Sequence, residues 1–224
     1  MIPAMGPTKL ISDEARLNLL LAYLEEDAGR GDITTEALGI EGTCMAEITA
    51  KQKCVLAGIT AVRPLLIHFE INILSDLPDG KICSNGDKVL ILKGPAAALL
   101  KIERLILNII CRMSGIATAT RMLADSVSKA NPDCLVAATR KTTPGFRIFE
   151  KEAVIIGGGH PHRFDLGEAV MVKDNHLKFV PDPAEAVNRA ASYVDKPSTA
   201  DTTLSYGGGK PRHKKWIEIE ADTP

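Results

Sequence analysis

The sequence predicts an α/β fold in two parts, and three observations lead to this prediction. Residues 43–93 hold several strand patterns around one short helical segment, which indicates a small mixed sheet. Residues 95–130 are typical of one or two long helices. After residue 132, short apolar strands alternate with helical segments, which is the pattern of a parallel α/β sheet or barrel.

The elements of the first part follow from local patterns. Residues 10–28 predict an amphipathic helix that Ser12 caps and Gly29 ends, because leucines recur there at helical spacing. A polar loop is expected over residues 29–38, and a break in the long helix at Ser114-Gly115. Strands are predicted for "TCMAEITAK" (43–51), "QKCVLAG" (52–58) and "KVLILKG" (88–94). A short helix, weakened by its proline, is predicted for "TAVRPLLIHFE" (60–70).

The second part has a simpler order. Helices are predicted at 146–156 and 182–193, and a long Gly- and Pro-rich loop at 195–214. Short strands with little alternation, as expected when both faces are buried, are predicted for "CLVAAT" (134–139), "AVMVKD" (169–174) and "WIEIEA" (216–221).

The composition is that of an ordinary soluble globular protein. The chain has 224 residues, 45% hydrophobic and 25% charged, which suffices for one or two cores. A net charge of -1 argues against a nucleic-acid partner and against a membrane-surface role. We expect no signal peptide and no membrane span, since no uncharged apolar stretch reaches about 20 residues. Any bound anion must therefore be met by local placement of cations.

The five cysteines are odd in number and far apart, and no C-x-x-C pair occurs. Neither a disulfide framework nor a zinc site is expected, and reduced thiols in a cytoplasmic protein are the natural interpretation. Cys111 and Cys134 lie in apolar runs and are expected in the core.

Charged residues gather at the ends of the predicted strands. Arg140 and Lys141 come directly after "CLVAAT", and Lys173 ends the next strand. Glu218 and Glu220 lie in the last strand. In α/β sheets and barrels ligands bind at the carboxyl ends of the strands, so these groups are expected to share one face.

A triple glycine, Gly157–Gly159, precedes His162 and Arg163, and it permits positive φ and close backbone approach. His160 and His176 are left open between a structural and a functional role. Arg147 and Lys151 lie on a helix with two glutamates, where ordinary surface ion pairs are expected.

Cations gathered with carboxylates point to a polyanionic substrate and a divalent ion. Arginine forks onto carboxylates and phosphates, lysine supplies a point charge, and glutamate holds Mg²⁺ through oxygen. The spacing alone therefore predicts an enzyme that acts on a phosphorylated or polycarboxylate metabolite.

Several unusual motifs in order carry a resemblance to one family. "EDAGRGDITTEAL", "LNIICRMSGIATAT", "TRKTTPGFRIFEKEAVIIGGGHPHRFDL" and "VMVKDNHL" resemble successive signatures of quinolinate phosphoribosyltransferase, also called nicotinate-nucleotide pyrophosphorylase (carboxylating). The match runs from about residue 15 to 185 and resumes at "KKWIEIEAD". The resemblance implies that quinolinate and phosphoribosyl pyrophosphate give nicotinate mononucleotide, pyrophosphate and carbon dioxide, with Mg²⁺, in NAD biosynthesis.

The resemblance also implies an architecture. It implies an N-terminal α/β sandwich domain at 1–117 and an α/β barrel at 118–224, in homodimers or homohexamers with shared active sites. Sequences of the family continue beyond the point reached by Pro224, so a truncated barrel is expected. Residues 1–224 alone are then expected to bind quinolinate better than phosphoribosyl pyrophosphate and to turn over negligibly.

Substrate-binding residues are implied by the same resemblance. Arg140, His162 and Arg163 resemble residues that bind the two carboxylates of quinolinate. Arg104 resembles an arginine that reaches the site from the neighbouring subunit.

Catalytic residues are implied in the same way. Lys141 and Lys173 resemble lysines near the pyrophosphate and the reacting carboxylate. Glu220 resembles an acidic residue near the ribose and the Mg²⁺ ion, although Glu218 lies two residues away on the same strand face and is easily confused with it.

Two other functions remain open at this point. One is a paralogue associated with molybdenum transport, which keeps the fold and acts on a different substrate. The other is a non-catalytic fragment that retains only dimerisation or ligand binding.

Overall fold

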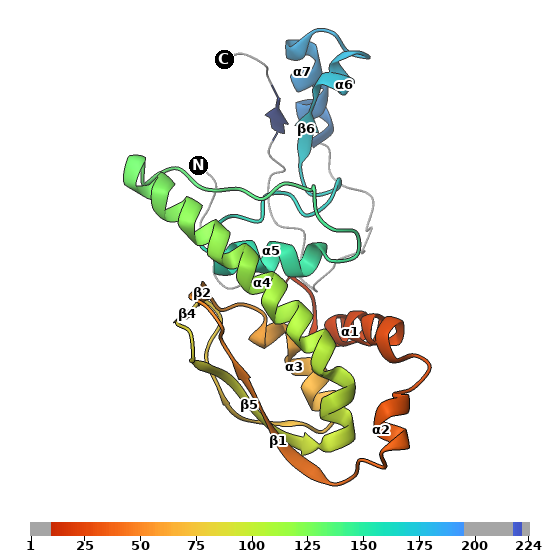
Figure 1. Cartoon of the computed structure of the whole chain (residues 1–224). Coiled ribbons are helices and arrows are strands. Elements are labelled where there is room, and N and C mark those ends of the chain that lie inside the picture. The colour runs from red at the N-terminus through yellow and green to blue at the C-terminus, as the bar shows by residue number, and fades with distance from the viewer. Residues whose placement is uncertain (1–9, 195–216, 221–224) are drawn as a thin grey trace. The chain divides into compact units, whose positions relative to one another are not determined.

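The computed structural model describes residues 10–194 and 217–220, and its mixture of helices and strands confirms the α/β fold class (Figure 1). The chain forms two compact units, one ending at Pro161 and one beginning at His162. The domain boundary predicted between residues 117 and 118 falls inside a continuous helix and stays a prediction.

A small antiparallel sheet forms the centre of the first unit. Its order is β1 (Thr43–Thr49), β5 (Lys88–Pro95) and β3 (Asn72–Asp76), and β2 (Cys54–Val55) pairs separately with β4 (Ile82–Cys83). The strands predicted at 43–51, 52–58 and 88–94 are thus confirmed, with the middle one reduced to two residues. In β5, Val89, Leu90 and Leu92 are buried, and they join the core beneath the helices.

Helices cover this sheet and supply most of the buried apolar side chains. In α1 (Asp13–Ala28), Ser12 caps the first turn by accepting from the amide of Ala15 at 3.2 Å, as predicted. In α3 (Ile59–His68), Pro64 is tolerated because Val62, Leu65 and Leu66 are fully buried. The expectation of a polar loop over 29–38 was wrong in part, since the Asp32 side chain caps the short helix α2 (Ile33–Ala37).

One helix runs through the first unit without interruption. The break predicted at Ser114-Gly115 was wrong, because α4 (Ala96–Ala130) is continuous. The Ser114 hydroxyl exchanges hydrogen bonds with the backbone of Ala57 (2.9 and 3.1 Å) instead of ending the helix. Packing of α4 along the sheet outweighs the roughly 1 kcal/mol that a glycine costs inside a helix.

The strand predicted at 134–139 was also wrong. The segment forms only an isolated parallel bridge between Ala137 and His160. Gly158 has a φ of +93°, which turns the partner segment away on one side. On the other side His162, whose amide would make the next ladder bond, has a φ of +55° and is not extended, so the pairing ends after one bridge. Helix α5 (Arg147–Ile156), predicted at 146–156, lies between the two segments in sequence.

The second unit contains a parallel strand pair. Strand β6 (Val170–Val172) pairs in register with β7 (Ile217–Ile219), and the predicted strands at 169–174 and 216–221 are confirmed. Helices α6 (Asp174–Leu177) and α7 (Pro183–Val194) lie between them in sequence, and α7 confirms the helix predicted at 182–193. The loop predicted at 195–214 lies outside the described residues.

All five cysteines are free thiols. None of the five cysteines forms a disulfide, but Cys111 and Cys134 are exposed, so their predicted core positions were wrong. Cys111 lies on an outward position of α4, where apolar neighbours in sequence do not imply burial.

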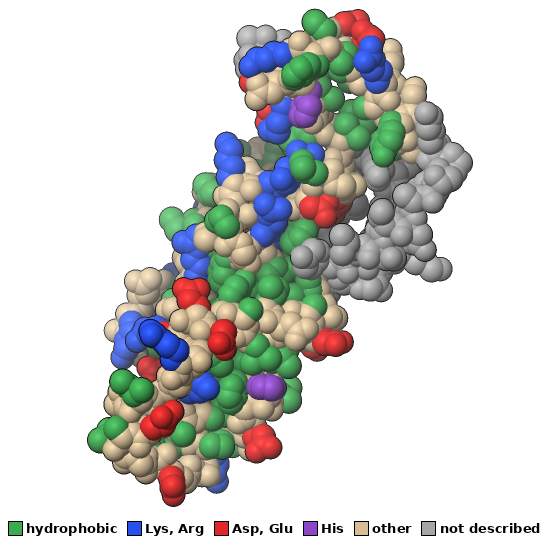
Figure 2. Space-filling model, turned by 90° about the vertical axis from the view of Figure 1, so that its right-hand side faces the viewer, with side chains coloured by type: hydrophobic (Ala, Val, Ile, Leu, Met, Phe, Trp, Pro, Cys, Tyr) green, Lys and Arg blue, Asp and Glu red, His purple; other side chains and the backbone are tan. Residues whose placement is uncertain are grey.

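Within the described ranges no helix is long and apolar enough to cross a bilayer. Figure 2 shows cationic and acidic side chains interspersed on one face, in keeping with the near-neutral charge.

Candidate active site

Helix α5 and its neighbours hold the loop that carries Arg140 and Lys141. The Nε of Arg147 donates to the Thr142 hydroxyl at 3.0 Å. The Thr143 hydroxyl donates to the Glu150 carboxylate at 2.8 Å, and Arg112 of α4 donates to the same carboxylate at 2.8 Å. The loop that follows the Ala137 bridge is therefore fixed by side chains of α4 and α5.

These contacts lower the pKa of the Glu150 carboxyl. Burial by itself raises its pKa, but hydrogen bonds from Arg112 and Thr143 outweigh burial and hold the pKa below its ordinary value of 4.5. The ionised form is therefore the one that the folded protein stabilises.

Glu150→Gln is expected to lower the free energy of unfolding by about 1 kcal/mol at neutral pH, because the ionised carboxylate accepts charge-assisted bonds. The folded-state pKa is depressed, so this contribution is complete above 4.5 and is lost as pH falls through the lowered folded value. Urea unfolding of both proteins across this range tests it. The exposed Glu41→Gln serves as the matched control, and a difference that grows in acid would contradict the assignment.

Arg140 has a polar atom that its surroundings leave unsatisfied. Its Nε is buried and has no hydrogen-bond partner among residues 10–194 and 217–220. A buried, unpartnered guanidinium nitrogen costs free energy unless a ligand satisfies it. Lys141, next in sequence, is exposed, and its amide donates to the Thr139 hydroxyl at 3.1 Å.

Lys151 departs most clearly from its predicted surface position. Its side chain is 0% exposed, and its ammonium donates to the carbonyls of Ala138 and Pro161. The surface position predicted for Lys151 was therefore wrong, whereas the surface ion pair predicted for Arg147 stays a prediction. The neighbouring Glu152 carboxylate is also engaged inward, with Arg16 of α1 at 2.6 and 2.8 Å.

The triple glycine is required by packing. A side chain at Gly157 would put its Cβ 2.6 Å from the Ala117 carbonyl oxygen, and one at Gly159 would lie 2.7 Å from Val154. Gly158 has a positive φ of +93°. The predicted close backbone approach and positive φ are both confirmed.

In the second unit, one histidine and one lysine each contact a carboxylate. His162 Nε2 lies 2.7 Å from a Glu218 carboxylate oxygen, and Lys173 Nζ lies 2.6 Å from one of Glu220. The parallel register of β6 and β7 sets Met171 opposite Glu218, which brings the two strands' charged residues together. Glu218 and Glu220, which the sequence leaves hard to separate, thus have different partners.

His162 has an unusual backbone conformation, and the Arg163 side chain is buried. His162 has a φ of +55°, a conformation that L-residues with large side chains adopt at a cost and that clusters at functional sites. Arg163 is 6% exposed and donates to the Ala169 carbonyl at 3.1 Å. Both side chains are therefore held in place by contacts within the second unit.

His160 and His176, whose roles the sequence left open, both take part in contacts with the backbone. His160 is buried, and its amide and carbonyl form the bridge with residues 136–138. His176 Nδ1 accepts from the Lys173 amide at 2.8 Å, which supports the first turn of α6. The His176 ring and the His160 backbone therefore support the local structure, and a functional role for the His160 side chain stays open.

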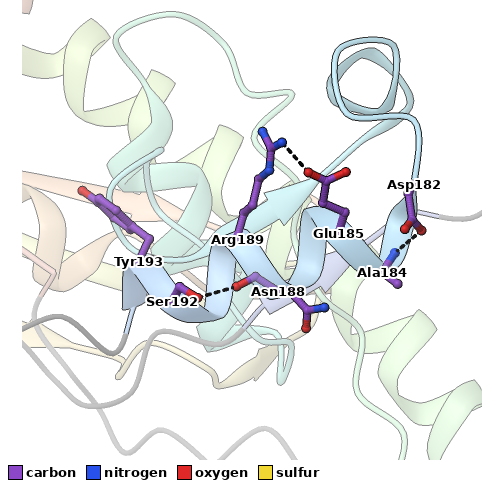
Figure 3. A pocket seen from close by; sticks show the side chains of 7 residues that line it. All are labelled: Asp182, Ala184, Glu185, Asn188, Arg189, Ser192 and Tyr193. Carbon is purple, nitrogen blue, oxygen red and sulfur yellow. Dashed lines mark hydrogen bonds and ion pairs between the residues drawn. The ribbon is translucent and has the colours of Figure 1, made fainter.

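Two further surface features are Arg104 and a hollow on α7. Arg104 lies exposed on α4 and makes no hydrogen bond or ion pair within the part of the chain that the structure describes. In Figure 3, a shallow hollow on α7 has its one arginine, Arg189, paired with Glu185, so no cation there is left for an anion. Its lining residues are Asp182, Ala184, Glu185, Asn188, Arg189, Ser192 and Tyr193.

Comparison with known proteins finds matches over residues 32–204. Residues 32–114 match the model of the quinolinate phosphoribosyl transferase N-terminal domain, and residues 116–204 match that of the C-terminal domain. A solved structure of NadC from Streptococcus pyogenes is 32% identical, covers 94% of this chain and 69% of its own, and superposes with a TM-score of 0.78.

The chain belongs to the quinolinate phosphoribosyltransferase family.

Relatives within the family are found in distant organisms. A probable nicotinate-nucleotide pyrophosphorylase [carboxylating] of Methanothermobacter thermautotrophicus is 41% identical over 179 residues, or 80% of this chain and 64% of the relative. A protein of the same name in Bacillus subtilis is 41% identical over 174 residues, or 77% and 60% of the two chains. The chain thus spans about three fifths of the length of these curated relatives. Neither they nor the Streptococcus structure support a molybdenum-transport paralogue.

The residues that this family resemblance implied are distributed over both units. Arg104, Arg140 and Lys141 belong to the first unit, with Arg104 on α4 and the other two on the loop that α5 holds. The second unit brings Lys173 to Glu220. His162 and Arg163 open that unit, and their roles as site residues stay predictions.

Sequence reasoning missed the anchoring residues of α5. Glu150 and Lys151 look like surface charges because glutamates and cations alternate along the helix. The available signal was the high hydrophobic content on both sides of them, in "RIF" and "AVII", which leaves little of the helix for solvent.

Proposed function

We propose that this protein transfers the phosphoribosyl group of phosphoribosyl pyrophosphate to quinolinate, with loss of carbon dioxide. It is then a decarboxylating pentosyltransferase of NAD biosynthesis. The single observation that carries the proposal is Arg140, whose buried Nε is unpartnered among the described residues, in a chain of this family. The protein's five cysteines form no disulfide, and free thiols are typical of a reducing compartment, which supports a cytoplasmic location.

The chain's own residues have distinct tasks in this reaction. Arg140, His162 and Arg163 bind the two carboxylates and orient the pyridine nitrogen toward the ribose carbon. The bond from that nitrogen to the ribose carbon forms as the bond to pyrophosphate breaks. Lys141 and Lys173 stabilise the negative charge on the leaving group.

Decarboxylation follows from the same binding arrangement. The pyridinium ring accepts the electron pair when the bond to the neighbouring carboxylate breaks, and a proton then replaces carbon dioxide at that carbon. No protein nucleophile is required. Lys173, next to the reacting carboxylate in this assignment, is held by Glu220 at 2.6 Å.

The donor set suits a magnesium ion that arrives with the substrate. Among the described residues no group of three or more His, Cys, Asp and Glu side chains is arranged to hold a metal. Glu220 supplies one exposed carboxylate, and Mg²⁺ is commonly held by one or two carboxylates together with substrate phosphates. Glu220 would therefore hold the ion, which would neutralise charge on the pyrophosphate.

An apolar groove supports a homodimer or higher homo-oligomer with shared sites. The groove has a volume of about 970 Å³ and lies between β1 and α4 in the first unit. Met45, Leu100 and Met122 line it and are exposed, as expected for a surface that another protein chain covers. Arg104 is exposed on the same helix, next to the lining residue Glu103. A second copy is the occupant that accounts for both features.

Calorimetric titration with quinolinate and with nicotinate tests the proposed function. Quinolinate is expected to bind more than about tenfold tighter, because nicotinate lacks the second carboxylate and leaves a cation unpaired. Equal affinity for the two ligands would contradict the assignment.

Mixing two variants tests the shared site. Arg104→Ala and Arg140→Ala are each expected to lose quinolinate binding when pure. After subunit exchange, roughly a quarter of the sites in a mixture of dimers receive both arginines from intact chains. Calorimetric stoichiometry measures this recovery, and native mass spectrometry confirms the exchange. Full exchange without recovered sites would show that Arg104 does not serve a neighbour.

A further inference from the structure

Lys173 stands at the junction of β6 and α6 in the second unit, and it is an unusual residue for that position. It is the N-cap of α6, and its backbone is extended, with a φ of −124° and a ψ of 168°. N-cap residues are usually Ser, Thr, Asp or Asn, because their side chains accept a hydrogen bond from the first turn. A lysine ammonium has donors and no acceptor, so it cannot do this. A residue that breaks a local rule in this way indicates a demand from outside the helix.

His176 supplies a contact that supports this junction in place of an ordinary cap. Its Nδ1 accepts from the Lys173 amide at 2.8 Å, and its own amide donates to the Lys173 carbonyl at 2.8 Å. The first contact is half of a capping box, in which the third residue of a helix reaches back to the N-cap amide. Because Nδ1 accepts, the proton of the neutral imidazole lies on Nε2. One residue therefore holds the Lys173 backbone on both sides.

The Lys173 side chain is held at its other end by Glu220. Its Nζ lies 2.6 Å from a Glu220 carboxylate oxygen, and the Glu220 amide donates to the Val172 carbonyl at 2.9 Å. That backbone bond places Glu220 beside the end of β6. The lysine and glutamate side chains are 38% and 53% exposed, and exposed pairs of this kind are weak by themselves. The pair therefore depends on the direction in which the Lys173 backbone points the side chain.

We propose that His176 is a positioning residue for Lys173, because it holds the amide at the strand–helix junction and so directs the ammonium toward Glu220. This inference rests on the proposed function, in which Lys173 stabilises negative charge on the leaving group. It assigns His176 no contact with substrate. All the contacts that carry it lie within the second unit. Fixing the backbone of a long, flexible side chain reduces the conformations that remain open to its charged end.

Replacing His176 tests the proposal, with the reductive methylation rate of each lysine, measured by mass spectrometry, as the readout. His176→Leu removes the acceptor, and Lys173 is expected to react about threefold faster as its ammonium leaves Glu220. His176→Gln keeps an acceptor for the N-cap amide, so its Lys173 rate should stay within about 1.5-fold of the unmutated one. An unchanged rate in the leucine variant, or equal rates in both variants, would overturn the proposal.

A control variant and a substitute complete this experiment. Asn188→Leu, on an exposed position of α7, makes the same kind of change from polar to apolar and should alter no lysine rate by more than about 1.5-fold. His176 is itself exposed, so its replacement leaves no cavity in a core. If the leucine variant does not fold, His176→Ala, which also lacks the acceptor, takes its place.

Lys178 separates positioning from a general loss of the helix. It is the C-cap of α6, and its Nζ donates to the Asn175 side-chain oxygen at 2.7 Å. If His176 only supported the helix, its loss would free Lys178 together with Lys173. We expect the Lys178 rate in His176→Leu to stay within about 1.5-fold of the unmutated rate. Equal acceleration of the two lysines would overturn the proposal.

Inorganic pyrophosphate relates this positioning to the proposed function. It is added at millimolar concentration without Mg²⁺, which would compete for Glu220. It is expected to slow Lys173 methylation at least about twofold in the unmutated protein and in His176→Gln, and less in His176→Leu. Equal protection in all three proteins would overturn the proposal. If the unmutated protein shows no protection, the assignment of Lys173 to the leaving group fails, and the rates without pyrophosphate still decide whether His176 positions Lys173.

Discussion

Replacing Arg140 with alanine is expected to weaken quinolinate binding by a factor of about 30 to several thousand, which corresponds to about 2 to 5 kcal/mol. The Arg140 Nε is buried and has no partner among the described residues, and in the proposed function a substrate carboxylate supplies the missing acceptors. Removing it leaves a bound carboxylate without its charge-assisted hydrogen bonds.

Calorimetry with quinolinate measures the effect, with Arg30→Ala as the control. Arg30 is exposed in the loop after α1, and its replacement should change affinity by less than about twofold. Arg140 is a cleaner choice than Arg163, because Arg163 also donates to the Ala169 carbonyl and its loss disturbs the local fold. Unchanged affinity in a folded Arg140→Ala protein would remove this residue from the site.

Replacing Arg16 with methionine is expected to lower the free energy of unfolding by about 3 to 5 kcal/mol, the cost of breaking a buried ion pair. Arg16 is 2% exposed and Glu152 13% exposed, and the two are joined by parallel bonds of 2.6 and 2.8 Å. The Arg16 guanidinium also lies 5.9 Å from the centre of the Phe149 ring. Its removal strands the Glu152 carboxylate in a low-dielectric region.

Chemical denaturation measures this change, and an exposed pair provides the control. Arg63 and Asp76 are 2.7 Å apart at the surface, so Arg63→Met should cost less than about 1 kcal/mol. The double variant Arg16→Met with Glu152→Leu should regain much of the lost stability, because a packed apolar pair can replace a buried ion pair. An Arg16→Met protein as stable as Arg63→Met would show that the pair is not buried in solution.

Because α5 carries Glu152 as well as Glu150 and Lys151, the same helix contacts α1, α4 and the backbone carbonyls of Ala138 and Pro161. Loss of the Arg16 pair is therefore expected to loosen the loop that carries Arg140 as well as the helix packing. Tyr23 of α1 adds to this link by donating to the Gly145 carbonyl at 2.5 Å.

Much of the framework could be predicted because it depends on neighbours in sequence. The Ser12 cap, the strands β1 and β5, and the glycines before His162 express local preferences of the backbone. The family could be inferred from several unusual motifs in the right order, and both of its domain models match this chain.

Tertiary structure alone decided the burial of charges and the extent of the elements. The partner of Glu152 lies 136 residues away, so the sequence around α5 indicates burial but not which distant side chains engage its three central charges. Likewise, Ser114 looks like a helix break until Ala57 offers it a backbone partner. Residues 134–139 look like a strand, but their partner segment leaves the extended conformation at Gly158 and His162 and allows only one bridge. Sequence patterns report what each segment prefers, whereas burial and pairing depend on which distant segment arrives beside it.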